Sequence, residues 1–349
     1  MREIRIQLTK FTDAFADDIT ACFLASVFFQ AFSSFFSTGN LMKVLILAGG
    51  ESAERSVSLA GGKAVHHAIG QLPEFESVLI DPSQQPWLNI ASDVVFPVLH
   101  GSDGEDGSLQ RVLEKNGQAF VGSGSAACEL TFNKQACSKR LTQHGIACPA
   151  EVGVNFGQSE DVWKDAFRQL KAVAPNSNQW VVKPNQQGSS VGIAVLDDTN
   201  SSFSEQLVSA IRNAFQFDQT CLIQQYIAGR EITVSLLDGE VLSAIEISVP
   251  SGFYDFHAKY ESLTTKYQIA RDQTAKICCN QAKQINHDCH CEGIVRIDFR
   301  IDKTGHPWFL ELNTIPGMSE RSLVPKSAVE RGWSLSELCR RAIMNVLAD

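Results

Sequence analysis

The sequence predicts an α/β domain with a parallel sheet at its N-terminal end, followed by an α+β half with antiparallel strands. Short apolar strands alternate with helices up to about residue 122, which is the pattern of a parallel sheet. Beyond this point, two pairs of strands are joined by short turns that contain Asp and Gly, as in β-hairpins. A chain of 349 residues is long enough for about two to three domains.

The first domain begins with a buried strand over Val44 to Leu47, which is short and aliphatic and ends at Gly49-Gly50. A helix is expected over 54–69, and further strands over 77–80 and 94–98. Ligands bind at the carboxyl ends of parallel strands. The loops GGESAERSVS and LHGSDGEDG lie at these ends, so we expect a binding site there.

The second half changes pattern after a helical pair over 126–144. Two more helices are expected over 161–173 and 203–215, and a terminal helix over 334–347 with Ser334 as its N-cap. The strands that we expect in this half run over residues 180–183, 192–195, 222–225, 232–237, 241–247, 294–301 and 307–313.

Composition and charge narrow the class of protein. Hydrophobic residues make up 44% and charged residues 20% of the chain, as in a folded globular protein. The formal charge of −9 argues against nucleic acid and anionic membranes as partners, since both require clustered Lys and Arg. The ten cysteines are scattered without a repeated CxxC spacing, so we expect reduced thiols. The group between Cys278 and Cys291 could hold zinc, but adjacent thiols on a helix point in different directions.

Residues 1–41 do not match the rest of the chain. Eight of the 21 phenylalanines lie before residue 37, in an apolar run over 19–36 that polar residues interrupt. A transmembrane helix needs about 20 mostly apolar residues, and a secretory signal has a basic start, whereas acidic residues precede this run. We therefore expect the fold to begin near Met42, with an upstream misread or unrelated leader before it rather than a membrane anchor.

The C-terminal hairpin, VRIDFRIDKTGHPWFLELNT, carries the strongest chemical pattern. Residues i and i+2 share one face of a strand, so Arg296 points with Asp298, and Glu311 with Asn313. If the strands pair, two carboxylates and an amide oxygen converge on one patch, which suits Mg²⁺. A surface patch of ion pairs is the alternative. Ile297, Phe299, Leu310 and Leu312 alternate with these residues and are expected in the core.

Three other segments could bind ligands. VVKPNQQGSSVG is not a Walker A loop, but it places Lys183 before a flexible turn that could cover phosphates, or could be a plain hairpin loop. Glu54, at the start of a helix, complements the helix dipole or receives an ammonium group. Residues 253–267 hold three of the four tyrosines and are either a lid or a surface loop.

Taken in order, these segments resemble a D-alanine–D-alanine ligase of the ATP-grasp superfamily. The resemblance runs from about Lys43 to the C-terminus and rests on six motifs: GGESAERSVSL, LHGSDGEDGSLQ, VKPNQQGSSVG, AKY, GIVRIDF and ELNTIPGMSERSLVP. It implies an extension of unknown role over 1–41, an N-terminal α/β substrate domain over 42–124, an ATP-grasp small domain over 125–225 and an ATP-grasp C-terminal domain over 226–349 with a lid loop at 250–270.

The resemblance implies a role for each matching residue. ATP would be bound at its phosphates by Lys134, Lys183 and Lys259, at its adenine by Gln224, Gln225 and Ile227, and at its ribose by Glu231. Two Mg²⁺ ions, or Mn²⁺ in their place, would be held by Asp298, Glu311 and Asn313. The first D-alanine would meet Glu54 and His100, and the second Arg296, Gly317, Ser322 and Leu323. The catalytic residues would be Glu54, Ser189, Arg296 and Tyr260, with Ser189 and Tyr260 hydrogen-bonded to Glu54 in a closed lid.

The implied reaction is the ATP-dependent formation of D-alanyl-D-alanine through an acyl phosphate, for peptidoglycan precursors in the cytoplasm. The chain departs from the family pattern at Ser56, Asn133, Gln224 and Ala270, but keeps each phosphate lysine and metal ligand. D-lactate or D-serine as second substrate, and a non-catalytic nucleotide-binding homologue, are the alternatives. The oligomeric state stays open, a homodimer included.

Overall fold

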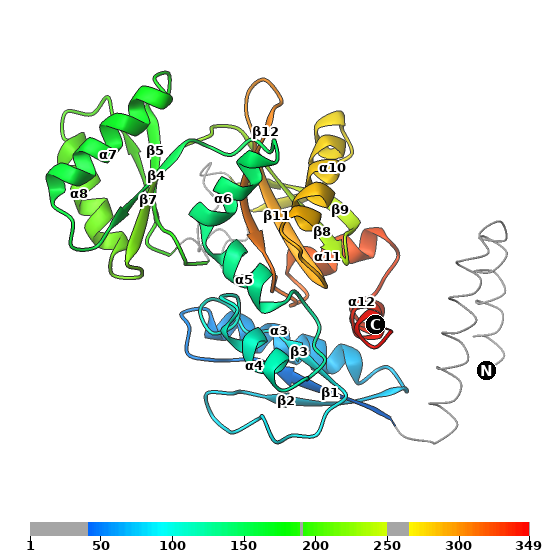
Figure 1. Cartoon of the computed structure of the whole chain (residues 1–349). Helices are drawn as coiled ribbons and strands as arrows, with labels where there is room; N and C mark the ends of the chain where they lie inside the picture. The colour runs from blue at the N-terminus through cyan, green and yellow to red at the C-terminus, as the bar shows by residue number, and fades with distance from the viewer. Residues whose placement is uncertain (1–40, 189–190, 250–264, 349) are drawn as a thin grey trace.

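The computed structural model describes residues 41–188, 191–249 and 265–348. Three sheets organise this part of the chain, as Figure 1 shows: a three-stranded sheet near the N-terminus, a four-stranded sheet and a five-stranded sheet. The first sheet is parallel and the other two are antiparallel, as the sequence predicts. The domain boundaries at residues 124 and 225 stay predictions.

The parallel sheet has the order β2-β1-β3. Its strands are β1 (Met42–Leu47), β2 (Phe75–Ile80) and β3 (Val94–Pro97), and its chain also forms α3 (Arg55–Ile69) and α4 (Ser108–Lys115). The C-terminal helix α12 (Leu335–Val346) shares an apolar core with β1. The last helix of the chain therefore packs against the first domain (Figure 1). Ser334 caps this helix by accepting a hydrogen bond from the Glu337 N–H, as expected.

The four-stranded sheet has the order β4-β7-β5-β6. Its strands are β4 (Glu151–Asn155), β5 (Gln179–Pro184), β6 (Ala194–Asp197) and β7 (Thr220–Gln225), and helices α7 (Glu160–Val173) and α8 (Phe203–Ala214) pack on it. The sequence analysis missed β4 and placed β6 two residues too early. Gly192 has a φ of 71°, a turn conformation rather than an extended one, so the strand begins only after it.

The five-stranded sheet has the order β10-β9-β8-β11-β12. Its strands are β8 (Arg230–Leu237), β9 (Glu240–Ser248), β10 (Lys266–Ile269), β11 (Ile294–Ile301) and β12 (Pro307–Asn313), and α10 (Gln273–Asp288) and α11 (Leu323–Glu330) pack nearby. Asp238 and Gly239 both have positive φ values, as a two-residue hairpin turn requires. The predicted hairpins are thus confirmed, whereas β10 and α11 were not predicted.

The expected helical pair is two short helices, α5 (Ser125–Phe132) and α6 (Lys134–Gln143). Asn133 separates them with an extended backbone, and its side chain accepts a hydrogen bond from the Ala136 N–H. This N-cap makes Lys134 the first residue of α6. Its backbone N–H donates to the carbonyl of Asn185, the residue that follows β5, at 3.3 Å.

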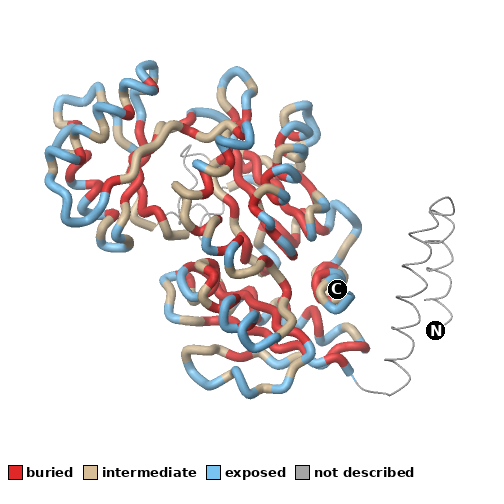
Figure 2. Tube along the Cα trace, in the orientation of Figure 1, coloured by how far each residue is buried: buried red, intermediate tan, exposed pale blue. Residues whose placement is uncertain are grey.

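Burial follows the three sheets, as Figure 2 shows. Separate apolar clusters lie beneath the parallel sheet, the four-stranded sheet and the five-stranded sheet. Among the described residues, no helix is both long and apolar enough to cross a membrane. The apolar run over 19–36, which the sequence analysis singled out, lies outside the described residues.

Candidate active site

The C-terminal hairpin brings its polar residues together as predicted. Asp298 lies directly opposite Glu311, and Arg296 opposite Asn313, in the antiparallel pair of β11 and β12. A β-bulge follows Asp298, because Phe299 pairs with Phe309 and leaves Leu310 without a partner in the register. Leu310 therefore lines a cavity instead of the core, and its predicted core position is wrong. The bulge re-aims this side chain.

Asp298 is held firmly in place. Arg296 donates to it twice, from Nε at 3.0 Å and from Nη2 at 2.9 Å, and the Thr233 hydroxyl donates to Oδ1 at 2.5 Å. Thr233 faces Asp298 from β8 in the sheet register. Sequence reasoning missed Thr233, although a hydroxyl in a buried strand is a signal for a polar partner.

The oxygen atoms of the hairpin suit a hard divalent cation. Arg296 Nη2 lies 4.0 Å from Glu311 Oε1, so one guanidinium neutralises both carboxylates of the pair. Asn313 Oδ1 accepts the Ile315 N–H at 2.9 Å, which fixes the amide. Among the described residues, no group of three or more His, Cys, Asp and Glu side chains is placed to hold a metal by itself. Two carboxylates and an amide fit Mg²⁺ only where substrate phosphates and water complete the shell.

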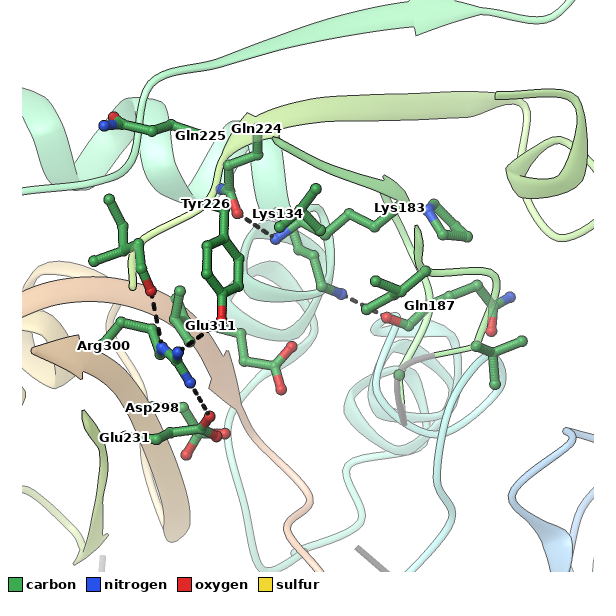
Figure 3. Close-up of a pocket in the computed structure, with 17 residues that line it drawn as sticks. Lys134, Lys183, Gln187, Gln224, Gln225, Tyr226, Glu231, Asp298, Arg300 and Glu311 are labelled. Atoms are coloured by element: carbon green, nitrogen blue, oxygen red, sulfur yellow. Dashed lines mark hydrogen bonds and ion pairs between the residues drawn. The ribbon is translucent and has the colours of Figure 1, made fainter. Parts of the chain in front are cut away.

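A cavity lies between the two antiparallel sheets, and we call it the inter-sheet cavity. Strands from both sheets supply its walls: Lys183 on β5, Gln224 on β7, Glu231 on β8, Asp298 and Arg300 on β11, and Glu311 on β12. Figure 3 shows their side chains pointing into the same space. Of the residues expected at ATP, the structure brings this set together: Lys134, Lys183, Gln224, Gln225, Ile227 and Glu231.

Lys183 is buried at the back of the inter-sheet cavity. Burial lowers its pKa, because the ammonium form loses hydration. Its Nζ donates to Gln224 Oε1 at 2.9 Å, and Gln224 Nε2 donates to Glu151 Oε2 at 2.7 Å. Burial raises the pKa of Glu151. Lys183 donates to the amide oxygen of Gln224, and Glu151 accepts from its amide nitrogen. These two bonds fix the orientation of the amide, with its oxygen toward Lys183.

Lys134 reaches the cavity from the N-terminus of α6. Its Nζ donates to the Gln187 carbonyl at 2.6 Å. Asn185 ties this helix to the end of β5, since its Oδ1 accepts the Gln135 N–H and its Nδ2 donates to Asn133 Oδ1. Sequence reasoning missed Asn185, which links the two lysine-bearing segments. Asn133, a departure from the family pattern, thus has a structural use.

Arg300 is a further cavity residue that the sequence analysis did not select. It follows Asp298 by two positions on β11, so the same alternation that joined Arg296 to Asp298 also predicts its face. It lines the inter-sheet cavity and is only 7% exposed. Its Nη1 donates to Glu231 Oε2 at 3.1 Å. Glu231, which the sequence analysis expected at the ribose, is therefore one partner of an ion pair.

A second cavity lies where loops from all three parts of the fold meet, and we call it the loop cavity. It contains these residues expected at the amino acid substrates: Glu54, His100, Arg296, Gly317, Ser322 and Leu323. Glu54 occupies the N-cap position of α3 but makes no side-chain capping bond, and it is buried. Its side chain lines the loop cavity and does not cap the helix.

His100 is buried beside Glu54 in the same cavity. Its Nδ1 lies 3.5 Å from Glu105 Oε1, and its Nε2 has no hydrogen-bond partner among the described residues. The Glu105 oxygen also accepts the Gly101 N–H at 3.0 Å. Glu105 thus connects the imidazole to the loop, and the sequence analysis missed this residue within LHGSDGEDG.

The glycine-rich segment after β5 lies close to Glu54 at Gly188. A Cβ atom on Gly188 would lie 2.6 Å from Glu54 Oε2, closer than carbon and oxygen atoms can pack. Gly188 lines both cavities, as do Lys134, Gln187 and Glu311. The two cavities therefore share one wall.

The expectations for Ser189, Lys259 and Tyr260 lie outside the described residues, as does most of the expected lid loop. Tyr267, just after this gap, lines the loop cavity, and so does Arg321. The sequence analysis selected neither of these two residues for the site.

The thiols near α10 are placed for packing. Cys278, Cys289 and Cys291 lie within the apolar cluster beneath the five-stranded sheet. Burial raises the pKa of Cys278 to about 12, so the thiol form dominates at neutral pH. No described group of His, Cys, Asp and Glu meets the arrangement needed for zinc.

Two antiparallel sheets with a charged cavity between them, next to an acidic hairpin, form the ATP-grasp fold, and the site defines an ATP-dependent ligase. Family models bear this out: "D-ala D-ala ligase C-terminus" matches residues 141–344, and "D-ala D-ala ligase N-terminus" matches residues 80–123. The chain belongs to the D-alanine–D-alanine ligase family.

Individual relatives agree with this assignment. The D-alanine–D-alanine ligase of Pseudoalteromonas translucida is 37% identical over 311 residues, which cover 87% of this chain and 97% of that protein. The ligase of Bacillus anthracis complexed with ATP has a TM-score of 0.73 at 26% identity, over 88% of this chain and 97% of that one. The VanG D-Ala:D-Ser ligase of Enterococcus faecalis has a TM-score of 0.73 at 25% identity, over 87% and 99%.

Proposed function

We propose that this chain joins two D-alanine molecules to D-alanyl-D-alanine with cleavage of ATP to ADP and phosphate, for peptidoglycan precursors in the cytoplasm. One observation carries the proposal: Lys134, Gly188 and Glu311 line both cavities. A nucleotide in the inter-sheet cavity and an amino acid in the loop cavity would meet at this shared wall. Phosphoryl transfer requires that kind of contact between the two reactants.

In the first step, a carboxylate oxygen of the first D-alanine attacks the γ-phosphorus of ATP. The bond between the γ-phosphorus and the bridging oxygen breaks, and ADP leaves with the electron pair. Glu54 binds the ammonium group, so the carboxylate of the amino acid faces the shared wall. Lys134 and Lys183 bind the phosphates and neutralise their charge, which is the main requirement of phosphoryl transfer.

Asp298, Glu311 and Asn313 are the residues that would hold Mg²⁺. When bound, the ions would neutralise phosphate charge and align the phosphates. Arg296 keeps Asp298 in position through two hydrogen bonds. The donor set of two carboxylates and one amide matches the preference of Mg²⁺ for oxygen ligands.

In the second step, the neutral amine of the second D-alanine attacks the acyl carbon. The resulting tetrahedral oxyanion forms within reach of the loop cavity wall that contains Arg296 and Gly317. A guanidinium and a backbone N–H stabilise such an anion. Collapse expels phosphate, and the amine loses its proton, so the products are the dipeptide, ADP and phosphate.

The decisive measurement is ADP release coupled to product analysis, with D-alanine, L-alanine and D-lactate as substrates. D-alanine alone is expected to support turnover and to give D-alanyl-D-alanine. Dominant ester formation with D-lactate at neutral pH, or dominant mixed product with D-serine, would move the assignment to a ligase of another second substrate. ADP release with no amino acid dependence would contradict the ligase activity.

A further inference from the structure

Arg300 joins three separate parts of the inter-sheet cavity. Its Nη1 donates to Glu231 Oε2, its Nε to the Ile227 carbonyl and its Nη2 to the Tyr226 hydroxyl, each at 3.1 Å. All of these residues line the cavity. The guanidinium thus donates its hydrogen bonds to groups in the cavity wall (Figure 3).

The sheet register makes this arrangement rigid. Arg300 on β11 lies directly opposite Glu231 on β8, so the ion pair spans neighbouring strands. The connection from β7 to β8 presses against the end of β11, because a Cβ atom on Gly229 would lie 1.8 Å from the Ile301 carbonyl. Glycine is required there, and the close approach brings the Ile227 carbonyl within reach of the guanidinium.

The acceptors around Arg300 explain how its charge is kept inside the protein. Arg300 is nearly buried, and a buried guanidinium is stable only where fixed acceptors satisfy it. Its guanidinium carbon lies 5.5 Å from the centre of the Tyr226 ring, a distance at which the ring face attracts a cation. Arg300 therefore orients the carboxylate of Glu231.

We propose that Arg300 is a positioning residue for nucleotide selection: it orients Glu231 toward the ribose hydroxyls and holds the carbonyl of Ile227 at the base, so that recognition of the ribose depends on Arg300. This inference rests on the proposed function, because it assigns the ribose to Glu231. A correctly aimed carboxylate accepts hydrogen bonds from both ribose hydroxyls, and a loosely held one loses this selectivity.

The test compares equilibrium dissociation constants for ATP and for its 2′-deoxy and 3′-deoxy forms, measured by calorimetry without amino acid substrate. Binding without turnover keeps this test independent of the ligase activity. The wild type is expected to bind ATP roughly tenfold more tightly than each deoxy form. Glu231→Gln and Arg300→Met are each expected to reduce that ratio to nearly one, and the double variant to have the same ratio as either single variant.

Controls separate positioning from general loss of structure. Arg230→Met removes an exposed guanidinium from the same sheet, one that binds Glu246 and Asp272, and is expected to keep the wild-type ratio. Tyr226→Phe removes one acceptor of Arg300 and is expected to reduce the ratio only in part. If Arg300→Met does not fold, Arg300→Lys decides, since a lysine keeps the charge but lacks the planar fork that reaches three separate acceptors.

Three results would overturn the inference. One is a wild type that binds all three nucleotides equally. Another is an unchanged ratio in Glu231→Gln. The last is an Arg300 variant that weakens ATP and both deoxy forms by the same factor, which would give Arg300 a purely structural role. If the wild type forms no dipeptide but shows the expected ratio of dissociation constants for ATP and its deoxy forms, the proposed function is contradicted, whereas the role of Arg300 is not.

Discussion

The two cavities share a wall but are built differently. The inter-sheet cavity has strands on its sides, and its polar groups bond to one another: Lys183 to Gln224, and Arg300 to Glu231. The loop cavity has loops and helix starts on its sides in addition to strands, and the buried Nε2 atom of His100 has no partner among the described residues. The inter-sheet cavity is therefore preorganised by its own contacts, whereas the loop cavity contains a polar atom, His100 Nε2, with which a ligand can form a hydrogen bond.

This difference predicts how many cavity groups a single substitution will disturb. A change within a mutually bonded network disturbs several cavity groups together, because each partner orients the next. A change at an isolated polar group affects mainly the ligand group that it meets. Four substitutions test this contrast, from the largest expected effect to the smallest.

Glu311→Ala changes the wall that both cavities share. It removes a proposed metal ligand and one of the two carboxylates near Arg296, so turnover is expected to fall by about 10³-fold or more. Steady-state ADP release measures the effect. Glu205→Ala on the exposed face of α8 is the matched control and should keep wild-type turnover. A Glu311→Ala enzyme with more than a tenth of normal activity would remove this residue from the site.

Glu54→Gln should act on one cavity only. The proposed ammonium ion of the first D-alanine loses its buried charged partner, so the KM for D-alanine at that site is expected to rise about 10²-fold. The KM for ATP should stay unchanged, because Glu54 lines only the loop cavity. Glu51→Gln, on an exposed position of the same loop, controls for the loss of one negative charge. Equal changes in both KM values would refute the separation of the two cavities.

Gly188→Ala should disturb both cavities moderately. The new Cβ atom would lie 2.6 Å from Glu54 Oε2, so the glycine-rich segment or the carboxylate must move. The KM values for ATP and for D-alanine are both expected to rise, roughly tenfold. Gly70→Ala, at the exposed end of α3 with an ordinary helical φ of −63°, should have no effect. An increase in the KM for only one of the two substrates would show that Gly188 affects only one of the two cavities.

Lys183→Arg should change the pH dependence of ATP binding. Burial lowers the pKa of Lys183 below the 10.5 of an exposed lysine, whereas bound phosphates favour its charged form. ATP binding therefore takes up a proton above the pKa of the free enzyme, and the dissociation constant for ATP should rise by up to tenfold per pH unit in that range. Arginine does not titrate there, so the variant should show a flatter profile. Parallel profiles would mean that Lys183 stays charged throughout.

Much of the fold followed from local pattern. The buried run at Val44 to Leu47, the alternation in β11 and β12 and the turn at Asp238-Gly239 are all confirmed, because side-chain period and turn residues act over short distances. Strand β4 was missed, and it pairs with β7, a strand 65 or more residues away along the chain. Such a short edge strand is stabilised by its partner rather than by its own composition.

The site divides in the same way. Sequence alone predicted the type of chemistry, because carboxylates, an amide and lysines at fixed spacings suit phosphates and a hard cation. Tertiary structure decided which groups meet: Thr233 at Asp298, Glu151 at Gln224, Arg300 at Glu231, and Gly188 at Glu54. The physical reason is distance along the chain. Spacing fixes the direction of neighbouring side chains. Only folding brings together residues that lie 65 positions apart, as Thr233 and Asp298 do, or still farther apart, as Gly188 and Glu54 are.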